Sequence, residues 1–178
     1  MPYRRLFVLV EGPDDVRFFD KIIKPKLQKK YNLVEIRPYS TWKKEKIDNF
    51  LRGIKAMNAY YIYVTDINTA RCVTTKKQEI EGKLKTIDRD RIAVVIKEIE
   101  SWYLAGLSNA EVEKFKIPTF SVTDNITKEQ FDSLVPKKFK NSRIDFMSEI
   151  LKCFSTEIAK QKNKSFRYVI EKYNCEVY

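Results

Sequence analysis

The stretch RRLFVLVEGPDDVRFFDKII, residues 4–23, decides the fold expected for this chain. Its continuous apolar run, residues 6–10, is typical of a strand covered on both faces, as in a parallel sheet. Pro13 suits the first position of a helix, and the carboxylates of Asp14 and Asp15 suit the positive end of its dipole. Glu11 ends the strand, either as an exposed strand-end residue or as half of a metal site.

The rest of the chain continues the alternation of strands and helices as far as about residue 107. We expect the first helix to fade around residues 24–30 (KPKLQKK), because Pro25 disfavours a continuous helix. Further strands are expected at residues 33–38, 59–66 and 92–96, an amphipathic helix at 42–57, a solvated helix at 74–87, and a helix that carries Trp102, Leu104 and Leu107. This order predicts an α/β, Rossmann-like fold with a mostly parallel sheet of about four strands flanked by helices.

The remaining part of the chain, residues 108–178, is expected to be a helical extension packed on the α/β core of residues 1–107. Apolar residues recur at helical spacing in residues 144–158, and a last helix is expected at residues 166–173.

Composition excludes several classes of chemistry. The 178 residues include no histidine, so mechanisms that need a histidine base or a histidine metal ligand are excluded within this chain. Only four glycines are present, and no glycine-rich phosphate loop occurs. The formal net charge of +11 favours an anionic partner, nucleic acid before a membrane.

Cysteine use indicates a reducing compartment. The three cysteines, Cys72, Cys153 and Cys175, are widely spaced and form no Cys-x-x-Cys pair, which argues against a zinc site. The apolar run near the N-terminus is too short for a signal peptide, and no run is long enough to span a bilayer. We therefore expect a cytoplasmic protein.

Acidic residues follow three of the four predicted strands. Glu11 ends the first, Asp66 ends the third with Asn68 two residues on, and Glu98 and Glu100 follow the fourth. The carboxyl ends of parallel strands share one edge of a sheet, so these side chains are expected to converge there. Clustered carboxylates repel one another unless a cation joins them, and oxygen ligands suit Mg²⁺ or Mn²⁺. Each acid also has a plain interpretation, as a turn residue or an exposed helix residue.

Three segments resemble the motifs of the TOPRIM domain, which topoisomerases, bacterial primases, ribosomal RNA maturases and the OLD-family nucleases share. VLVEGPDDVRFF resembles its first motif, YIYVTDIN its Asp-x-Asp motif, and VVIKEIESWYLAG the third acidic stretch of small OLD-like members. The resemblance covers about residues 4–107. By it, Glu11 corresponds to the family's metal-binding or acid/base glutamate, Gly12 to its turn glycine, and Asp15 to the aspartate three residues on.

The residues of the second and third motifs also correspond to positions in the family. Asp66 corresponds to the first acid of Asp-x-Asp, whereas Asn68 departs from the second. Glu100 is the preferred match in the third stretch, with Glu98 in reserve. The resemblance implies a cation held by Glu11, Asp66, Asn68 and Glu100, with Glu11, Asp66 and Glu100 catalytic. The uncharged Asn68 leaves open one metal, weak activity or none.

The resemblance implies metal-assisted hydrolysis of phosphodiester bonds, that is, a small Mg²⁺- or Mn²⁺-dependent nuclease. The chain is too short for the gate of a topoisomerase or the template-binding domains of a primase. Enzymatic activity stays open, because the alternative is a non-catalytic TOPRIM-like module that binds nucleic acid or a partner protein, with a homodimer also possible. A third possibility is a receiver-like phosphoacceptor that uses Asp14, Asp15 and Asp66.

Basic clusters offer candidate contacts to DNA or RNA. They lie at residues 24–30, 43–46 and 136–143, where solvated helix ends and loops are the alternative. The lysines singled out are Lys24, Lys26, Lys29, Lys30, Lys43, Lys44, Lys137 and Lys138. Trp102, with Tyr103, could stack on a base, but helical spacing favours a place in the core.

Overall fold

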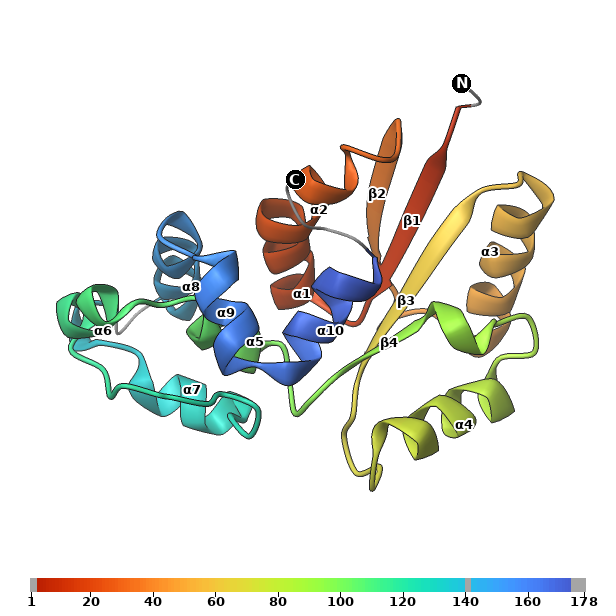
Figure 1. Cartoon of the computed structure of the whole chain (residues 1–178). Coiled ribbons are helices and arrows are strands. Elements are labelled where there is room, and N and C mark those ends of the chain that lie inside the picture. Colours follow the sequence, from red (N-terminus) through yellow and green to blue (C-terminus); the bar gives the residue numbers. More distant parts are fainter. Residues whose placement is uncertain (1–2, 140–141, 174–178) are drawn as a thin grey trace. The chain divides into compact units, whose positions relative to one another are not determined.

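The chain forms two compact units, Met1–Val95 and Ile96–Glu176. The structure, a computed structural model, describes residues 3–139 and 142–173 (Figure 1). Cys175 therefore lies outside the described residues, as do two positions of the basic cluster at 136–143. The domain boundary expected after residue 107 stays a prediction. Among the described helices, none combines the length and the apolar character that crossing a membrane requires.

The first unit is built on four parallel strands, which confirms the predicted fold class. They are β1 (Arg5–Val10), β2 (Leu33–Pro38), β3 (Tyr60–Asp66) and β4 (Ile92–Val95), in the order β2-β1-β3-β4. The chain first moves outward from β1 to β2 and then returns to place β3 on the other side of β1. The carboxyl ends of β1 and β3 therefore flank the point where the strand order reverses, which is where open α/β sheets bind ligands.

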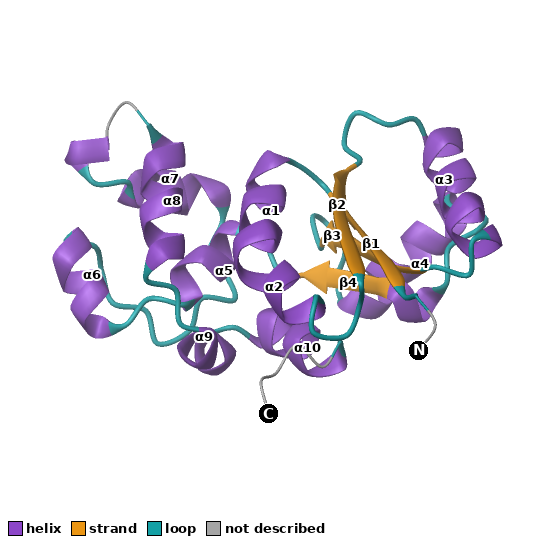
Figure 2. Cartoon of the chain, turned by 90° about the horizontal axis from the view of Figure 1, so that it is seen from above, coloured by secondary structure: helices purple, strands orange, loops and turns teal. Residues whose placement is uncertain are grey.

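The helix after β1 ends at Leu27, inside the segment 24–30 where it was expected to fade, although Pro25 itself is part of the helix. It runs through α1 (Pro13–Phe18), a π-helical turn (Phe19–Ile23) and α2 (Lys24–Leu27). In the π turn the Lys24 N–H bonds to the Phe19 carbonyl, five residues back. This shift of register occurs just before Pro25, where the missing N–H would otherwise break the ladder. Helices α1 and α2 cover one face of the sheet (Figures 1 and 2).

Two longer helices cover the opposite face, α3 (Lys44–Ala56) and α4 (Val73–Lys83). Alternate residues of the strands, such as Leu9 and Tyr63, pack there against Leu51 of α3 and Ile80 of α4. The expectation of a solvated helix over 74–87 was wrong in part. Helix α4 ends at Lys83, and it buries Lys76 and Lys77 as well as Ile80. A short 3-10 turn (Arg89–Arg91) leads into β4.

The second unit is helical in its described residues. Its helices are α5 (Glu100–Ala105), α6 (Asn109–Phe115), α7 (Lys128–Leu134), α8 (Arg143–Lys152), α9 (Thr156–Lys162) and α10 (Lys164–Lys172), with a 3-10 turn at Lys137–Phe139. The single helix expected over 144–158 is two helices. Ser155 caps α9 by accepting the Ile158 N–H at 3.3 Å, and its own N–H bonds to the Gly106 carbonyl at 2.9 Å. These bonds favour a new helix start over continuation of α8.

A buried amide organises the second unit. The Asn163 side chain donates to Ser101 Oγ and Thr123 Oγ1, both at 3.2 Å, and accepts the Phe166 N–H at the start of α10. Trp102 Nε1 donates to Ser165 Oγ at 2.8 Å. Trp102 and Tyr103 are fully buried, as the helical spacing predicted. Because each of these polar groups has its partner, the network costs little free energy and fixes one arrangement of the helices.

Two glycines allow a test of this packing. A Cβ at Gly106, at the end of α5, would lie 2.3 Å from the Phe154 ring, whereas a Cβ at Gly53 in α3 would meet no atom within 4 Å. We expect Gly106→Ala to lower the free energy of unfolding by about 1–3 kcal/mol. The control, Gly53→Ala, should raise it by about 0.5–1 kcal/mol through helix propensity. Urea unfolding would measure both; equal stability of the two variants would contradict the packing around Gly106.

Candidate functional site

Glu11 lies at the reversal point of the sheet and is held there by β3. Its Oε1 accepts the Thr65 hydroxyl and the Asp66 N–H, each at 2.9 Å. The Glu11 carbonyl accepts the Ser40 N–H at 3.1 Å, just after β2. The half-buried carboxylate is therefore fixed by β3, and the backbone that carries it is held by the segment after β2. Among the described residues Oε2 accepts no hydrogen bond, so this oxygen can take a ligand.

Two buried tyrosines stand beside this carboxylate. Tyr39 and Tyr63 stack with ring centroids 4.6 Å apart, and the Tyr39 hydroxyl donates to the Val64 carbonyl at 2.7 Å. Burial raises the pKa of Tyr63 to about 12, and the Glu11 charge adds to this effect. Burial is also the main reason that the pKa of Tyr39 is raised, and electrostatic interactions with Tyr63 and Glu11 raise it further. Both phenols therefore stay neutral, and neither adds negative charge beside the Glu11 carboxylate.

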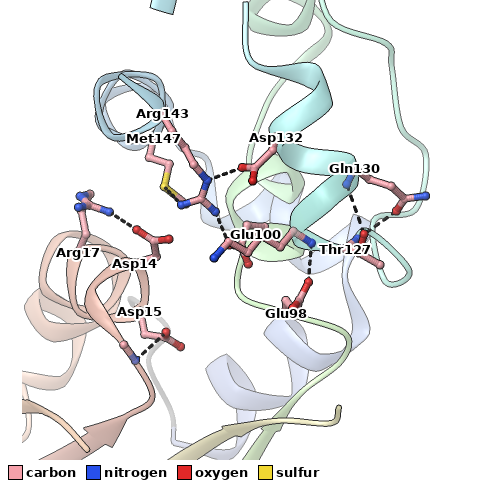
Figure 3. A network of polar contacts seen from close by, with 12 residues as sticks. Asp14, Asp15, Arg17, Glu98, Glu100, Thr127, Gln130, Asp132, Arg143 and Met147 are labelled. Carbon is pink, nitrogen blue, oxygen red and sulfur yellow. Dashed lines mark hydrogen bonds and ion pairs between the residues drawn. The ribbon is translucent and has the colours of Figure 1, made fainter. Parts of the chain in front are cut away.

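The residues after Glu11 have local structural roles. Pro13 begins α1, as predicted. Gly12 has extended backbone (φ −145°, ψ −170°), so the turn itself does not require glycine. Its N–H donates to Asp15 Oδ2 at 3.1 Å, and Asp14 pairs with Arg17 at 2.7 Å. Figure 3 shows both contacts at the start of α1. These acids cap and compensate the helix, which is the plainer of the two predicted roles.

Asp66 and Asn68 differ in their surroundings. Asp66 is half-buried at the last position of β3, next to the Glu11 carboxylate that its N–H binds. Asn68 is exposed and has left-handed backbone, with φ of 50°. Asparagine is among the few residues other than glycine that adopt this conformation at low cost. Aspartate tolerates this conformation as well, so the backbone of this turn permits either residue at position 68.

The two acids after β4 belong to the second unit, where both have protein partners. Glu98 accepts the Lys128 N–H at the start of α7 (Figure 3). Glu100, at the start of α5, forms an ion pair with Arg143 of α8, which also pairs with Asp132. Burial raises the pKa of the Glu100 carboxyl, and the Arg143 charge offsets part of that effect. Glu100 is therefore a buried carboxylate whose charge a cation already compensates.

The predicted metal ligands divide between the units: Glu11, Asp66 and Asn68 lie in the first, and Glu100 lies in the second. Within residues 3–139 and 142–173, no group of three or more Asp, Glu or Cys side chains is arranged to hold a metal ion. The four-residue ligand set, the catalytic roles and the bound Mg²⁺ or Mn²⁺ stay predictions.

The basic clusters are spread over both units. Lys24 pairs with Asp20 at 3.1 Å, which leaves it less available to a partner. The exposed lysines of the set are Lys29, Lys43, Lys44, Lys137 and Lys138. Lys137 and Lys138 line a cavity of about 660 Å³ in the second unit, together with Lys114 and Lys116. Lys138 Nζ lies 5.0 Å from the centre of the Phe139 ring. The structure thus places Lys114 and Lys116 beside the predicted cluster around Lys137 and Lys138.

The sequence analysis missed Tyr39, Thr65 and the buried pair Lys76 and Lys77. Thr65 directly precedes Asp66, so the end of β3 was already singled out, but nothing in the motif indicates its hydrogen bond to Glu11. Tyr39 follows the last residue of β2, at the same edge of the sheet. Its position at a strand end was the one feature of the sequence that could have identified Tyr39 as part of the site.

The ion pair of Glu100 generates a prediction about stability and pH. The pKa of Glu100 is raised in the folded protein, so the folded state binds more protons than the unfolded state just above the ordinary glutamate pKa. Its contribution to stability is therefore fully present at low pH and falls as the pH rises through the folded-state pKa. Arg143→Ala should raise the pKa of Glu100 further, extend this fall to higher pH and cost about 2–4 kcal/mol at pH 7, since it leaves a buried charge unpaired.

Two control variants separate the partners of Arg143. Asp132→Asn removes the more exposed carboxylate and should cost less than about 1 kcal/mol. Glu100→Gln should remove the pH dependence that Glu100 contributes. Urea unfolding from pH 4 to pH 8 would measure all three variants, and the same pH profile for Arg143→Ala and wild type would contradict the burial of the pair.

Comparison with known proteins gives one structural similarity. The solved structure of the C-terminal region of the OLD protein of Xanthomonas campestris pv. campestris is similar over 96% of this chain and 94% of that chain, with 12% sequence identity and a TM-score of 0.38. No protein-family model and no curated protein matches the sequence.

Proposed function

We propose that the protein is a metal-dependent nuclease that hydrolyses phosphodiester bonds of nucleic acid. The observation that carries the proposal is the placement of Glu11. It lies beside Asp66 where the strand order of a parallel sheet reverses, with one carboxylate oxygen held by β3 and the other open to a ligand. The net charge of +11 supports an anionic substrate. Both residues belong to the TOPRIM-like motifs, Glu11 to VLVEGPDDVRFF and Asp66 to YIYVTDIN.

The donor set of this edge suits a hard divalent cation. Glu11 and Asp66 supply carboxylate oxygens, which Mg²⁺ and Mn²⁺ prefer, and we assign both residues as ligands. The bound cation would lower the pKa of a water molecule and offset negative charge on the reacting phosphate.

The chain's own residues have distinct roles in this proposal. Thr65 and the Asp66 N–H orient Glu11, so that its free oxygen has a fixed position. Tyr39 and Tyr63 keep water from one side of the carboxylate and stay neutral. The exposed lysines Lys43 and Lys44, at the start of α3, would attract the phosphate backbone. With no histidine in the chain, proton transfer would fall to a carboxylate, a lysine or water.

Glu11→Gln tests the proposal most directly. It keeps the shape of the side chain and the acceptor for Thr65 and Asp66, but it removes the charge that a cation needs. We expect cleavage of labelled single- or double-stranded DNA or RNA, with Mg²⁺ or Mn²⁺, to fall at least about a hundredfold, as expected when metal-assisted chemistry is lost.

The matched control is Glu35→Gln, the same substitution on the neighbouring strand β2. Glu35 is half-buried and pairs with Arg5 and Arg37, away from the carboxyl ends of the strands. Its loss should leave cleavage unchanged. Cleavage that survives in Glu11→Gln, with the fold intact by circular dichroism, would refute the nuclease proposal at this site.

A second candidate is a non-catalytic module that binds nucleic acid or a partner protein. Two observations favour it: Glu100 already has a cationic partner in Arg143, and Asn68 brings no charge to the edge that holds Glu11 and Asp66. Binding of nucleic acid by both wild type and Glu11→Gln, with no cleavage by either, would select this function.

Residue 68 offers a test of cation binding that does not depend on activity. We expect Asn68→Asp to tighten binding of Mg²⁺ or Mn²⁺ about tenfold, because a carboxylate adds charge to the proposed site. Asn68→Gly is the control, since glycine keeps the left-handed backbone without a side chain. Isothermal titration calorimetry would measure both. Equal affinity of the aspartate and glycine variants would show that residue 68 is not a ligand.

A further inference from the structure

A small aromatic cavity lies in the first unit, on the face of the sheet that α3 and α4 cover. Its volume is about 270 Å³. The stacked rings of Tyr39 and Tyr63 form one part of its lining, and Trp42 forms another. Aliphatic side chains of α3 and α4 complete it. The cavity therefore offers flat, apolar surfaces to a planar ligand.

Trp42 is half-buried and has a defined orientation. Its ring packs edge-on against Phe50, with centroids 5.2 Å apart, and the Lys46 ammonium lies 4.4 Å from its centre. The exposed lysines Lys44 and Lys83 belong to the lining of the cavity, and none of its described lining residues is acidic. An apolar interior with a basic rim suits a planar group attached to a phosphate.

This cavity shares residues with the surroundings of Glu11. Ser40, which lines the cavity, donates its N–H to the Glu11 carbonyl at 3.1 Å, and the Tyr39 N–H bonds to the Val10 carbonyl at 2.9 Å. Along β1 and β3, Glu11 and Thr65 fall on the same face as Leu9 and Tyr63, by the two-residue alternation of strands. A ligand in the cavity would therefore lie next to the proposed catalytic edge.

We propose that this cavity holds one nucleobase of a single-stranded nucleic acid, in contact with Trp42, while a neighbouring phosphate lies at Glu11. The inference rests on the proposed function, which places the phosphate at that edge. Single strands are required because a base in a duplex is stacked and paired, and must leave the helix to enter a pocket. The volume lies just below the range of about 300–1,000 Å³ of drug-sized sites, which suits one base rather than two.

Tryptophan fluorescence can test the inference without any cleavage. In EDTA at fixed salt, an octamer of deoxythymidylate should quench Trp42, whereas Trp102 is fully buried and should contribute a constant background. An abasic octamer with the same number of phosphates should quench little and bind less tightly. Trp42→Ala should lose the quench and weaken binding of the deoxythymidylate octamer by about fivefold or more, measured by anisotropy of a labelled strand.

Tyr168→Ala is the matched control. Tyr168 is an exposed aromatic residue of α10 with the Lys172 ammonium 5.5 Å from its ring, the same i,i+4 arrangement as Trp42 and Lys46. Its loss should change neither affinity nor quench. Because Trp42 packs on Phe50, circular dichroism must show that Trp42→Ala is folded. The exposed rim variant Lys44→Glu tests the site independently and should weaken binding of both octamers.

Failure of this inference and failure of the nuclease proposal are distinguishable. Equal quench by the abasic and deoxythymidylate octamers, or wild-type affinity in folded Trp42→Ala, would overturn the base site, even if Glu11-dependent cleavage is found. Quench that depends on the base, retained in Glu11→Gln, would support the base site even if neither protein cleaves.

Discussion

The structure of the candidate site depends on one interaction, the carboxylate of Glu11 bound across to the end of β3. The backbone ladder between β1 and β3 pairs Leu9 with Tyr63 and goes no further. Two residues later, Glu11 Oε1 accepts hydrogen bonds from the Asp66 N–H and the Thr65 hydroxyl. A side chain therefore continues the hydrogen bonding between β1 and β3 beyond the point where the backbone pairing ends. A strand-end acid thereby gains a fixed position. Since only one of its oxygens is used, the bond that fixes Glu11 leaves it able to bind a ligand.

Local patterns predicted the first unit well, because three of its strands are short apolar runs rich in β-branched and aromatic residues and the fourth, β2, alternates. All four strands begin and end within one residue of the predicted positions, and β2 matches throughout. The features that were not predicted are a change of hydrogen-bond register inside a helix and contacts between distant residues. No sequence rule shows that a π turn will precede Pro25, or that Ser155 will bond to Gly106 and start a new helix. Likewise Glu100 meets Arg143, 43 residues away, and this pairing decides how its charge is compensated.

The contrast between Glu11 and Glu100 bears on which acids can bind a cation. Both are carboxylates that follow strands, and both were predicted from the sequence to be metal ligands. Glu11 is oriented by neutral donors, which keep its charge uncompensated. Glu100 is buried and paired with the guanidinium of Arg143, which compensates its negative charge as a bound metal ion would. A cation at Glu100 would have to displace Arg143, and Arg143 would retain only Asp132 as an acidic partner. By this reasoning, Glu11 and Asp66 carry the proposed site.

The surroundings of Glu11 also limit what can approach it. On the side of α3 and α4, the phenols of Tyr39 and Tyr63 are too deeply buried to ionise, so they add no competing negative charge. The same rings line the aromatic cavity, whose rim carries Lys44 and Lys83. Glu11 and Asp66 place negative charge at the strand ends, and Lys44 and Lys83 place positive charge around the apolar cavity beside them. The edge with Glu11 and the aromatic cavity together suit a ligand that carries an anionic group next to a planar, apolar group. A nucleotide within a single strand has this form.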